Sequence, residues 1–285
     1  MNLSIGSALK KGENSLKKAG IENSRKEAAE ILENVTKLNT EQVFLLKNKN
    51  IGLRGTINFL KKIKRRKGGE PLQYITRSAY FFSRAFNIMK EVLIPRPETE
   101  ILVEAILTMD LKKKNLSCLD MCAGSGCIGI TLALENGNFR EITFADISLK
   151  ALKCCRKNIS KFKINKRAII VRSNFFSNIA KKKYDIICSN PPYVTINQYK
   201  NLEASVKNHE PKLALVSKNE GLEHLEKIAK EGRGFLKENG RIFFEVGINQ
   251  FKSVKNILKN FGYSELVTYN DLNGIKRVVS GKWKS

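Results

Sequence analysis

Histidine is scarce in this chain, and its cysteines are not arranged to bind a metal ion. Only two histidines occur among the 285 residues. None of the six cysteines forms a pair with the spacing of zinc ligands. We therefore expect no metal site, and reduced thiols in a cytosolic protein are the simplest interpretation of the cysteines.

Long apolar stretches are missing as well. No run of apolar residues approaches the length that spans a membrane. Residues 1–20 are rich in lysine and lack the apolar region of a signal peptide. Glu13 and the lack of arginine in this segment argue against an organellar transit peptide. We expect a cytoplasmic protein that does not bind membranes.

Acidic residues are few compared with basic ones. The chain has 27 Asp and Glu against 52 Lys and Arg, which gives a formal net charge of +25. Such a charge favours polyanionic partners, but a generally lysine-rich composition is the simpler explanation, because net charge affects association rather than fold. The clearest basic cluster lies between Lys61 and Lys67.

The hydrophobic pattern divides the chain into three parts. Residues 1–70 show helical periodicity only, which predicts a small helical bundle for substrate recognition. Its third helix should start at Thr40 and turn three apolar residues inward: Phe44, Leu45 and Leu46. Residues 71–98 contain short aromatic segments and prolines, which are typical of a hairpin that links two domains.

Strand and helix patterns alternate from residue 99 to residue 285. This alternation predicts a mostly parallel, Rossmann-like α/β sheet with helices on both faces. The predicted helices are 100–109, 126–135, 149–161, 221–237 and 250–261. The predicted strands are 117–121, 141–145, 168–171, 184–189, 241–246, 263–269 and 276–280.

A strand, a tight turn and a helix start occupy residues 119–129. Their small residues allow a ligand to approach the backbone, and the helix start offers unpaired N–H donors. Asp146 ends the next strand, 20 positions after Gly126, where an acidic side chain can accept hydrogen bonds from ribose hydroxyls. This pattern suits a nucleotide of either the NAD or the S-adenosylmethionine type, and Asp146 as a simple helix cap remains an alternative.

The second chemical motif follows the predicted strand 184–189 and reads Asn190-Pro191-Pro192-Tyr193. An amide or ring amino nitrogen is a weak nucleophile, so two acceptors must orient its N–H groups. The side-chain oxygen of Asn190 and the carbonyl of Pro191 can do this, and Tyr193 can pack against a planar group. The tetrapeptide resembles the one shared by methyltransferases that act on exocyclic or amide nitrogens. This resemblance implies methyl transfer to such a nitrogen, and no strong general base is required.

From about residue 25 onward, the chain resembles the protein-(glutamine-N5) methyltransferases that modify class-1 peptide chain release factors. Five segments carry the resemblance: residues 69–75, 93–100, 210–215, 244–247 and 270–278. The most specific is 93–100, because the sister family that acts on a ribosomal protein usually has serine and a small apolar residue in place of Pro97 and Glu98.

The resemblance implies a class I methyltransferase fold and a target glutamine in the Gly-Gly-Gln motif of the release factor. Separately, we expect a monomer. The resemblance also implies that Asn190, Pro191, Pro192 and Tyr193 hold this glutamine. S-adenosylmethionine would be bound by Asp120, Cys122, Ala123, Gly124, Ser125, Gly126, Asp146, Phe175 and Asn190. In this chain Cys122 and Ala123 replace the first glycine and the residue after it, but both are small, so the turn should survive.

Two other functions fit the same sequence. A methyltransferase acting on an adenine or guanine amino group of nucleic acid is favoured by the charge of +25. However, the chain has no extra recognition domain, and its N-terminal helices lack interleaved aromatic residues for base stacking. A non-catalytic RNA- or ribosome-binding protein would not need an intact cofactor turn or motif. We expect the release factor enzyme, without a requirement for nucleic acid.

Overall fold

The computed structural model describes residues 2–109 and 115–284. The chain divides into two compact units. The first consists of residues 1–78 and 203–209, and the second of residues 79–202 and 210–285. No helix in the described part of the chain is both long and apolar enough to cross a membrane.

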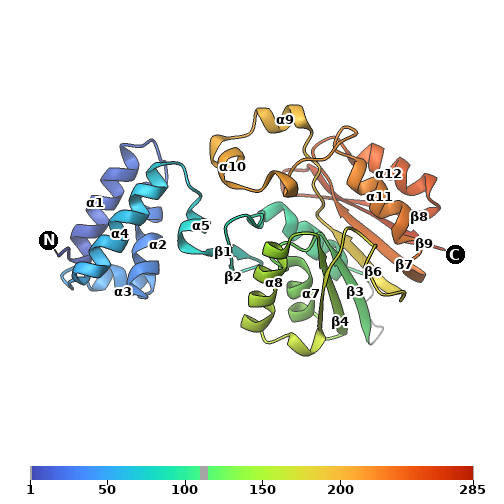
Figure 1. The fold of residues 1–285 in the computed structure, drawn as a ribbon, viewed down its shortest axis with the longest axis horizontal. Helices are drawn as coiled ribbons and strands as arrows, with labels where there is room; N and C mark the ends of the chain where they lie inside the picture. The colour runs from blue at the N-terminus through green and yellow to red at the C-terminus, as the bar shows by residue number, and fades with distance from the viewer. Residues whose placement is uncertain (1, 110–114, 285) are drawn as a thin grey trace. The chain divides into compact units, whose positions relative to one another are not determined.

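The first unit is helical (Figure 1). Its helices are α1 (Ile5–Lys17), α2 (Ser24–Thr36), α3 (Thr40–Leu45), α4 (Gly52–Lys67), α5 (Leu72–Thr76) and α10 (Ala204–His209). The apolar residues of α1, α2 and α4 recur at helical spacing and form one core. Phe59 of α4 fits over Gly12 of α1, where an added Cβ would lie 2.7 Å from the phenylalanine ring.

The inward orientation predicted for the third helix is wrong. Only Val43 of α3 is buried, whereas Leu45 is 82% exposed and Phe44 and Leu46 are partly exposed. The helix has six residues, and its capping box with Asn39 fixes where it starts. So short a helix offers one position to the core, and Val43 occupies it.

A hairpin of β1 (Ser78–Phe81) and β2 (Arg84–Asn87) follows, as expected, and the second unit starts at its second residue, Ala79. Its two turn residues, Phe82 and Ser83, both have positive φ, as a tight two-residue hairpin turn requires.

A seven-stranded sheet follows, in the order β5-β4-β3-β6-β7-β9-β8. Its strands are β3 (Leu116–Met121), β4 (Phe139–Asp146), β5 (Ala168–Arg172), β6 (Tyr184–Ser189), β7 (Leu236–Glu245), β8 (Tyr263–Asn270) and β9 (Lys276–Trp283). The first five strands in this order pair in parallel, and β9 is antiparallel to both β7 and β8.

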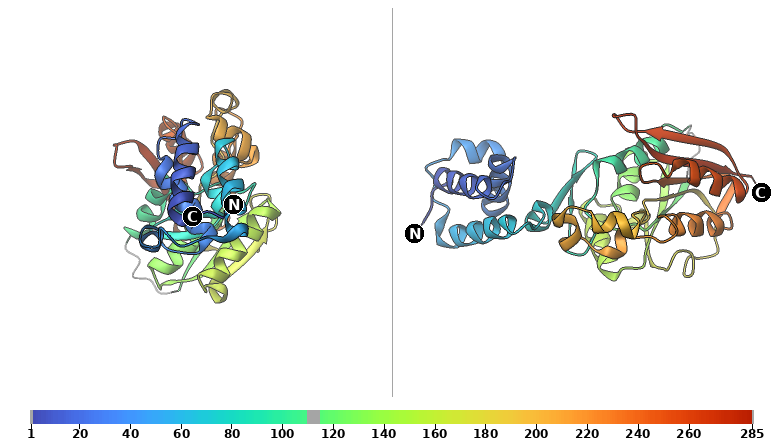
Figure 2. Two further views of the ribbon diagram at one scale, coloured as in Figure 1. Left: turned by 90° about the vertical axis from the view of Figure 1, so that its left-hand side faces the viewer. Right: turned by 90° about the horizontal axis from the view of Figure 1, so that it is seen from above.

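Helices cover both faces of this sheet (Figures 1 and 2). One core contains residues of α6 (Glu100–Leu107), α7 (Cys127–Glu135) and α8 (Leu149–Lys161), and the other contains residues of α11 (Glu223–Gly232) and α12 (Phe251–Asn260). Successive strand residues alternate between the two cores, because side chains along a strand point to opposite faces. Phe243 belongs to the first core, for example, and Phe244 to the second.

One predicted helix is too long. The segment 221–237 is helical only as α11, which ends at Gly232, and the following strand β7 starts at Leu236 rather than at residue 241. Gly232 and Gly234 weaken the helix at this point. In addition, the Tyr184 N–H donates to the Phe235 carbonyl at 2.7 Å, so pairing with β6 takes over. The short helix α9 (Ile196–Lys200) and helix α10 were not predicted at all.

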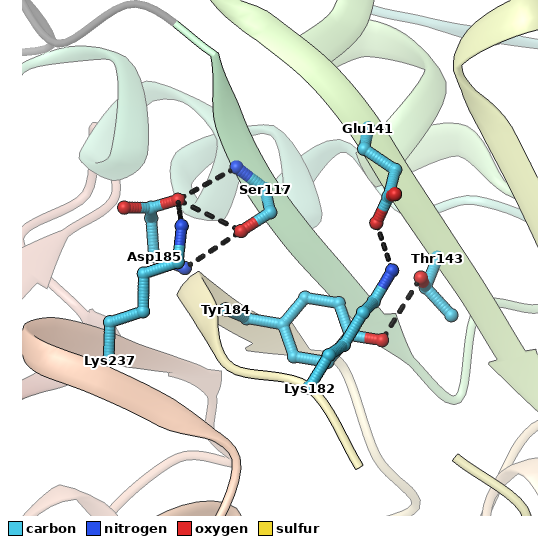
Figure 3. A network of polar contacts seen from close by, with 7 residues as sticks. All are labelled: Ser117, Glu141, Thr143, Lys182, Tyr184, Asp185 and Lys237. Atoms are coloured by element: carbon cyan, nitrogen blue, oxygen red, sulfur yellow. Dashed lines mark hydrogen bonds and ion pairs between the residues drawn. The ribbon is translucent and has the colours of Figure 1, made fainter. Parts of the chain in front are cut away.

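The amino ends of the parallel strands are tied together by a polar network (Figure 3). One oxygen of Asp185 accepts hydrogen bonds from the Ser117 N–H and hydroxyl, both at 2.9 Å, and from Lys237 Nζ at 2.6 Å. The buried Tyr184 donates to the Thr143 hydroxyl at 3.1 Å and so reaches from β6 across β3 to β4. This edge of the sheet is thus braced by polar contacts, and the loops that carry the predicted site lie at the other edge.

Candidate functional site

A cavity lies at the carboxyl ends of the parallel strands, and every residue on its wall belongs to the second unit. The connections after β3, β4, β5 and β6 supply much of that wall, as expected for an open α/β sheet. The predicted site residues that line it are Cys122, Ala123, Gly124, Ser125, Asp146, Phe175, Asn190 and Pro192. The others, Asp120, Gly126, Pro191 and Tyr193, are not on the wall.

The turn after β3 depends on left-handed backbone conformations. Cys122, Gly124 and Gly126 all have positive φ, which is costly for a residue with a side chain. At Gly126 an added Cβ would also lie 2.6 Å from the Cys155 sulfur. This turn therefore brings backbone and small side chains to the cavity and leaves room for a ligand beside it.

Asp146, the last residue of β4, holds the turn in place. Its Oδ2 accepts the Gly124 N–H at 2.9 Å, and its Oδ1 accepts the Ser148 N–H at 2.8 Å. Burial raises the pKa of this carboxyl group above its usual value, and the backbone hydrogen bonds oppose that rise. Each oxygen has a further lone pair, and the side chain lines the cavity. These acceptors beside the turn suit the ribose hydroxyls of a nucleoside.

Asp120 lies behind the turn rather than in the cavity. It is fully buried, and its Oδ2 accepts the Gly129 N–H of α7 at 3.0 Å. Its Oδ1 has no hydrogen-bond partner among the described residues. Burial raises the pKa of Asp120 to about 7. In this position the carboxyl group anchors the start of α7, and its predicted contact with a cofactor stays a prediction.

The raised pKa of Asp120 predicts a pH-dependent stability. Because the folded chain holds this proton more tightly than the unfolded chain, the carboxyl group contributes stability at low pH that is lost as the pH rises through about 7. Asp120→Asn removes the ionisation. We expect this substitution to be more favourable at pH 8 than at pH 5 by about 2–3 kcal/mol, measured by urea unfolding of both proteins. An equal effect at the two pH values would contradict it.

Aromatic side chains close another part of the cavity wall. Phe175, which the family resemblance assigns to the cofactor site, lies with its ring centroid 5.4 Å from that of His224. His224 also lines the cavity and donates from Nδ1 to the Pro192 carbonyl at 3.3 Å. Sequence reasoning missed His224, because a single histidine in a helical pattern gives no signal of its contacts.

The side chain of Asn190 is fixed by a residue far away in the sequence. Its Nδ2 donates to the Thr99 hydroxyl at 3.0 Å, which leaves its oxygen as the available acceptor. Tyr193 points elsewhere, because its hydroxyl donates to Oε1 of the buried Glu245 at 3.1 Å. Its predicted use as a flat wall for the substrate stays a prediction.

The backbone of the motif is held at Tyr193 by contacts with Gln250 and Gly221. The Gln250 amide nitrogen donates to the carbonyls of Tyr193 and Glu220, both at 3.0 Å, and its oxygen accepts the Gly247 N–H at 2.9 Å. Gly221 has a φ of +83° and lies so close that an added Cβ would be 2.1 Å from the Tyr193 carbonyl oxygen. Neither Gln250 nor Gly221 was identified from the sequence as a site residue.

An ion pair joins two of the segments that carried the family resemblance. Arg96 lines the cavity and pairs with the buried Glu210 at 2.5 Å. The second oxygen of Glu210 accepts the Ile94 N–H at 3.3 Å. Glu210 therefore holds the segment around Arg96 beside the cavity.

Comparison with known proteins agrees with this geometry. Residues 7–76 match the family model described as the PrmC N-terminal domain, and residues 97–209 match the methyltransferase small domain. A methyltransferase structure from Pyrococcus furiosus shares the fold, with a TM-score of 0.54 and 15% identity over 80% of this chain and 99% of that one. The predicted fold class, a class I methyltransferase sheet preceded by a helical domain and a hairpin, is confirmed.

Two curated relatives extend the match over nearly the whole chain. The bifunctional methyltransferase of Rickettsia prowazekii is 34% identical over 98% of this chain, which spans only 57% of that longer protein. The release factor glutamine methyltransferase of Clostridium botulinum is 35% identical, and the alignment covers 94% of this chain and 95% of the relative. Together with the cavity and its motif, this match shows that the chain belongs to the release factor glutamine methyltransferase family.

Proposed function

We propose that this protein transfers a methyl group from S-adenosylmethionine to the side-chain nitrogen N5 of the glutamine in the Gly-Gly-Gln motif of class-1 peptide chain release factors. One observation carries this proposal most directly. The Asn190 side chain stands on the wall of the cavity that the cofactor turn also lines, with its nitrogen bound to Thr99 and its oxygen left to accept. This is the arrangement that an incoming primary amide requires.

In this proposal the cofactor is held by residues 122–126, Asp146 and Phe175. When bound, S-adenosylmethionine supplies a methyl group already activated by its sulfonium. The left-handed turn offers backbone donors and space, Asp146 accepts from the ribose, and Phe175 lies against the adenine. Asp120 does not line the cavity and contributes by accepting the Gly129 N–H, which fixes the start of α7 behind the turn.

The motif orients the nucleophile. Asn190 Oδ1 and the Pro191 carbonyl accept the two N–H groups of the glutamine amide. These acceptors align the nitrogen and favour the positive charge that develops on it during transfer. Because the donor is already activated, positioning supplies the catalysis. The nitrogen releases one proton to solvent as the neutral N-methyl amide forms, and neither a strong base nor a metal ion forms part of the proposal.

The helical region 1–70 and the linker 71–98 recognise the rest of the release factor in this proposal, while residues 99–285 carry out the transfer. Basic residues at the end of α4 lie in the recognition region and would steer an acidic partner, with an association rate that falls as salt rises. We propose a monomer that works in the cytoplasm, where release factors act, and that needs no nucleic acid.

A methyl-transfer assay with labelled S-adenosylmethionine tests the proposal. The purified protein is offered a class-1 release factor and, separately, the same factor with the Gly-Gly-Gln glutamine changed to alanine. We expect label on the first protein and none on the second. Label on added RNA or DNA instead would establish the nucleic-acid methyltransferase, the alternative that the charge of +25 favours.

Gly221 gives a prediction about the motif backbone. Gly221→Ala adds a Cβ 2.1 Å from the Tyr193 carbonyl and 2.4 Å from the Gln250 amide, at a φ of +83°. The motif or Gln250 must move, and we expect kcat to fall at least about tenfold, because catalysis here depends on positioning. Gly137→Ala is the matched control, since an added Cβ there meets nothing within 4 Å. Equal activity of the two variants would refute the prediction.

A further inference from the structure

His224, in the first turn of α11, contacts both halves of the site. Its backbone N–H donates to the hydroxyl of the buried Ser217 at 3.5 Å, which holds the start of a helix that has no side-chain N-cap. Its side chain lines the cavity and meets Phe175 as well as the carbonyl of Pro192. A single ring thus contacts a residue of the proposed cofactor site and a residue of the motif.

Two side chains of α11 pack against Phe175. The His224 ring lies with its centroid 5.4 Å from that of Phe175, at an interplanar angle of 41°, and Lys227 Nζ lies 4.9 Å from the same centroid. His224 and Lys227 are three positions apart, so they are neighbours on one face of the helix. Phe175 has a φ of +54°, which is unfavourable for a bulky residue. These contacts therefore stabilise a conformation that the backbone of Phe175 alone does not favour.

The hydrogen bond to Pro192 has a defined direction. A carbonyl oxygen can only accept, so Nδ1 of His224 carries a proton and donates it across 3.3 Å. Nδ1 keeps this proton when the ring is charged, so the contact does not depend on the charge state of His224. Because proline has no N–H, the carbonyl is the only backbone group of Pro192 that a neighbouring side chain can hold.

Proline rings restrict most backbone rotations in the motif, but not ψ of Pro192. The rings of Pro191 and Pro192 fix both φ angles, and a following proline limits ψ at Asn190 and Pro191. Pro192 is followed by Tyr193, so its ψ has no such limit. Rotation about it would turn the Pro192 carbonyl and let the acceptors before it move against Tyr193, whose backbone is held in place. The hydrogen bond from His224 opposes this rotation.

We infer that His224 is a positioning residue for both halves of the site, and this inference rests on the proposed methyl transfer. Its ring supports Phe175 and thereby the adenine of bound S-adenosylmethionine. Its Nδ1–H holds the Pro192 carbonyl and thereby the two acceptors, the Asn190 oxygen and the Pro191 carbonyl. One side chain thus aligns the methyl donor and the accepting nitrogen, a geometry in which a small displacement slows the reaction.

Two substitutions separate the ring of His224 from its hydrogen bond. His224→Phe keeps an aromatic ring against Phe175 and removes the donor, whereas His224→Asn removes the ring and keeps an N–H donor near the position of Nδ1. With the full-length protein, a release factor and saturating S-adenosylmethionine, we expect kcat to be about five- to tenfold higher for His224→Asn than for His224→Phe. The Kd for S-adenosylmethionine, measured by calorimetry, should be about fivefold lower for His224→Phe than for His224→Asn.

This crossed order of the two variants distinguishes positioning from a general role in folding. Variants that lose turnover and cofactor affinity together would overturn the inference, as would equal kcat values or equal Kd values for the pair. The matched controls are His209→Phe and His209→Asn. His209 is the other histidine of the chain and is not on the cavity wall, so its variants should show no crossed order.

Melting temperatures identify any variant that fails to fold, and His224→Leu, which lacks both the ring and the donor, then takes its place. Its kcat should be lower than that of His224→Asn, and its Kd for S-adenosylmethionine should be higher than that of His224→Phe. The reverse order in either comparison would overturn the inference. A wild-type protein that labels no release factor would instead overturn the proposed function and, with it, this inference, so the two failures can be told apart.

Discussion

Asn190→Ala is expected to lower kcat for release factor methylation by about 10²–10³-fold, the usual cost of removing one preorganised group from a developing charge. The substitution removes the acceptor that faces the cavity and leaves the Thr99 hydroxyl without its donor. The turn after β3 and the carboxyl group of Asp146 are not altered. The affinity for S-adenosylmethionine should therefore stay within about tenfold of the wild-type value.

Single-turnover methyl transfer and calorimetric titration of the cofactor measure the two quantities separately. Asn256→Ala is a suitable control, because Asn256 is an exposed residue of α12 and replacing it removes an amide of the same kind far from the motif in sequence. Wild-type turnover in the Asn190→Ala protein would show that Asn190 takes no part in the reaction. A loss of cofactor binding as large as the loss of turnover would assign it to the cofactor instead.

The sheet elements could be predicted closely because their sequence signals are local. Helix α8 and strand β6 have the predicted bounds, and the other strands of the parallel part differ mainly at their ends. The predictions were wrong where tertiary contacts determine which residues are buried or where a helix ends. The apolar run in α3 contains more hydrophobic residues than its one buried position can use. Similarly, strand pairing at Phe235 ends a helix whose apolar pattern continues.

The cavity wall could be predicted for a topological reason. Parallel strands end at the same edge of a sheet, so motifs that follow such strands come together even when they are far apart in sequence. This placed Cys122, Asp146 and Asn190 around one cavity. Strand topology does not predict which side chains lie behind the cavity wall. The buried Glu245 is such a residue: it reaches the motif only through the Tyr193 hydroxyl, and no pattern near it in the sequence indicates this partner.

Replacement of Asp146 should affect cofactor affinity rather than kcat, the opposite of what is expected for Asn190. Asp146→Ala should raise the Kd for S-adenosylmethionine by about 10–100-fold, because hydrogen bonds to a charged group are each worth about 1.5–3 kcal/mol. The substitution removes the proposed ribose acceptor and also frees the Gly124 N–H, so the turn loosens. At saturating cofactor, however, kcat should largely recover, because the motif after β6 is unchanged.

A simple helix-bracing role for Asp146 makes a different prediction. Helix α8 is capped by the Ser148 side chain, which accepts the Ala151 N–H, so Asp146 is not its N-cap. If Asp146 served only to brace this segment, its loss would lower the melting temperature and leave the cofactor Kd unchanged. Asp146→Asn separates the two roles further, because the amide keeps one accepting oxygen but cannot accept from both Gly124 and Ser148. Its Kd should lie between those of the wild type and Asp146→Ala. A Kd unaffected by either substitution would leave the carboxyl group a purely structural part of the turn.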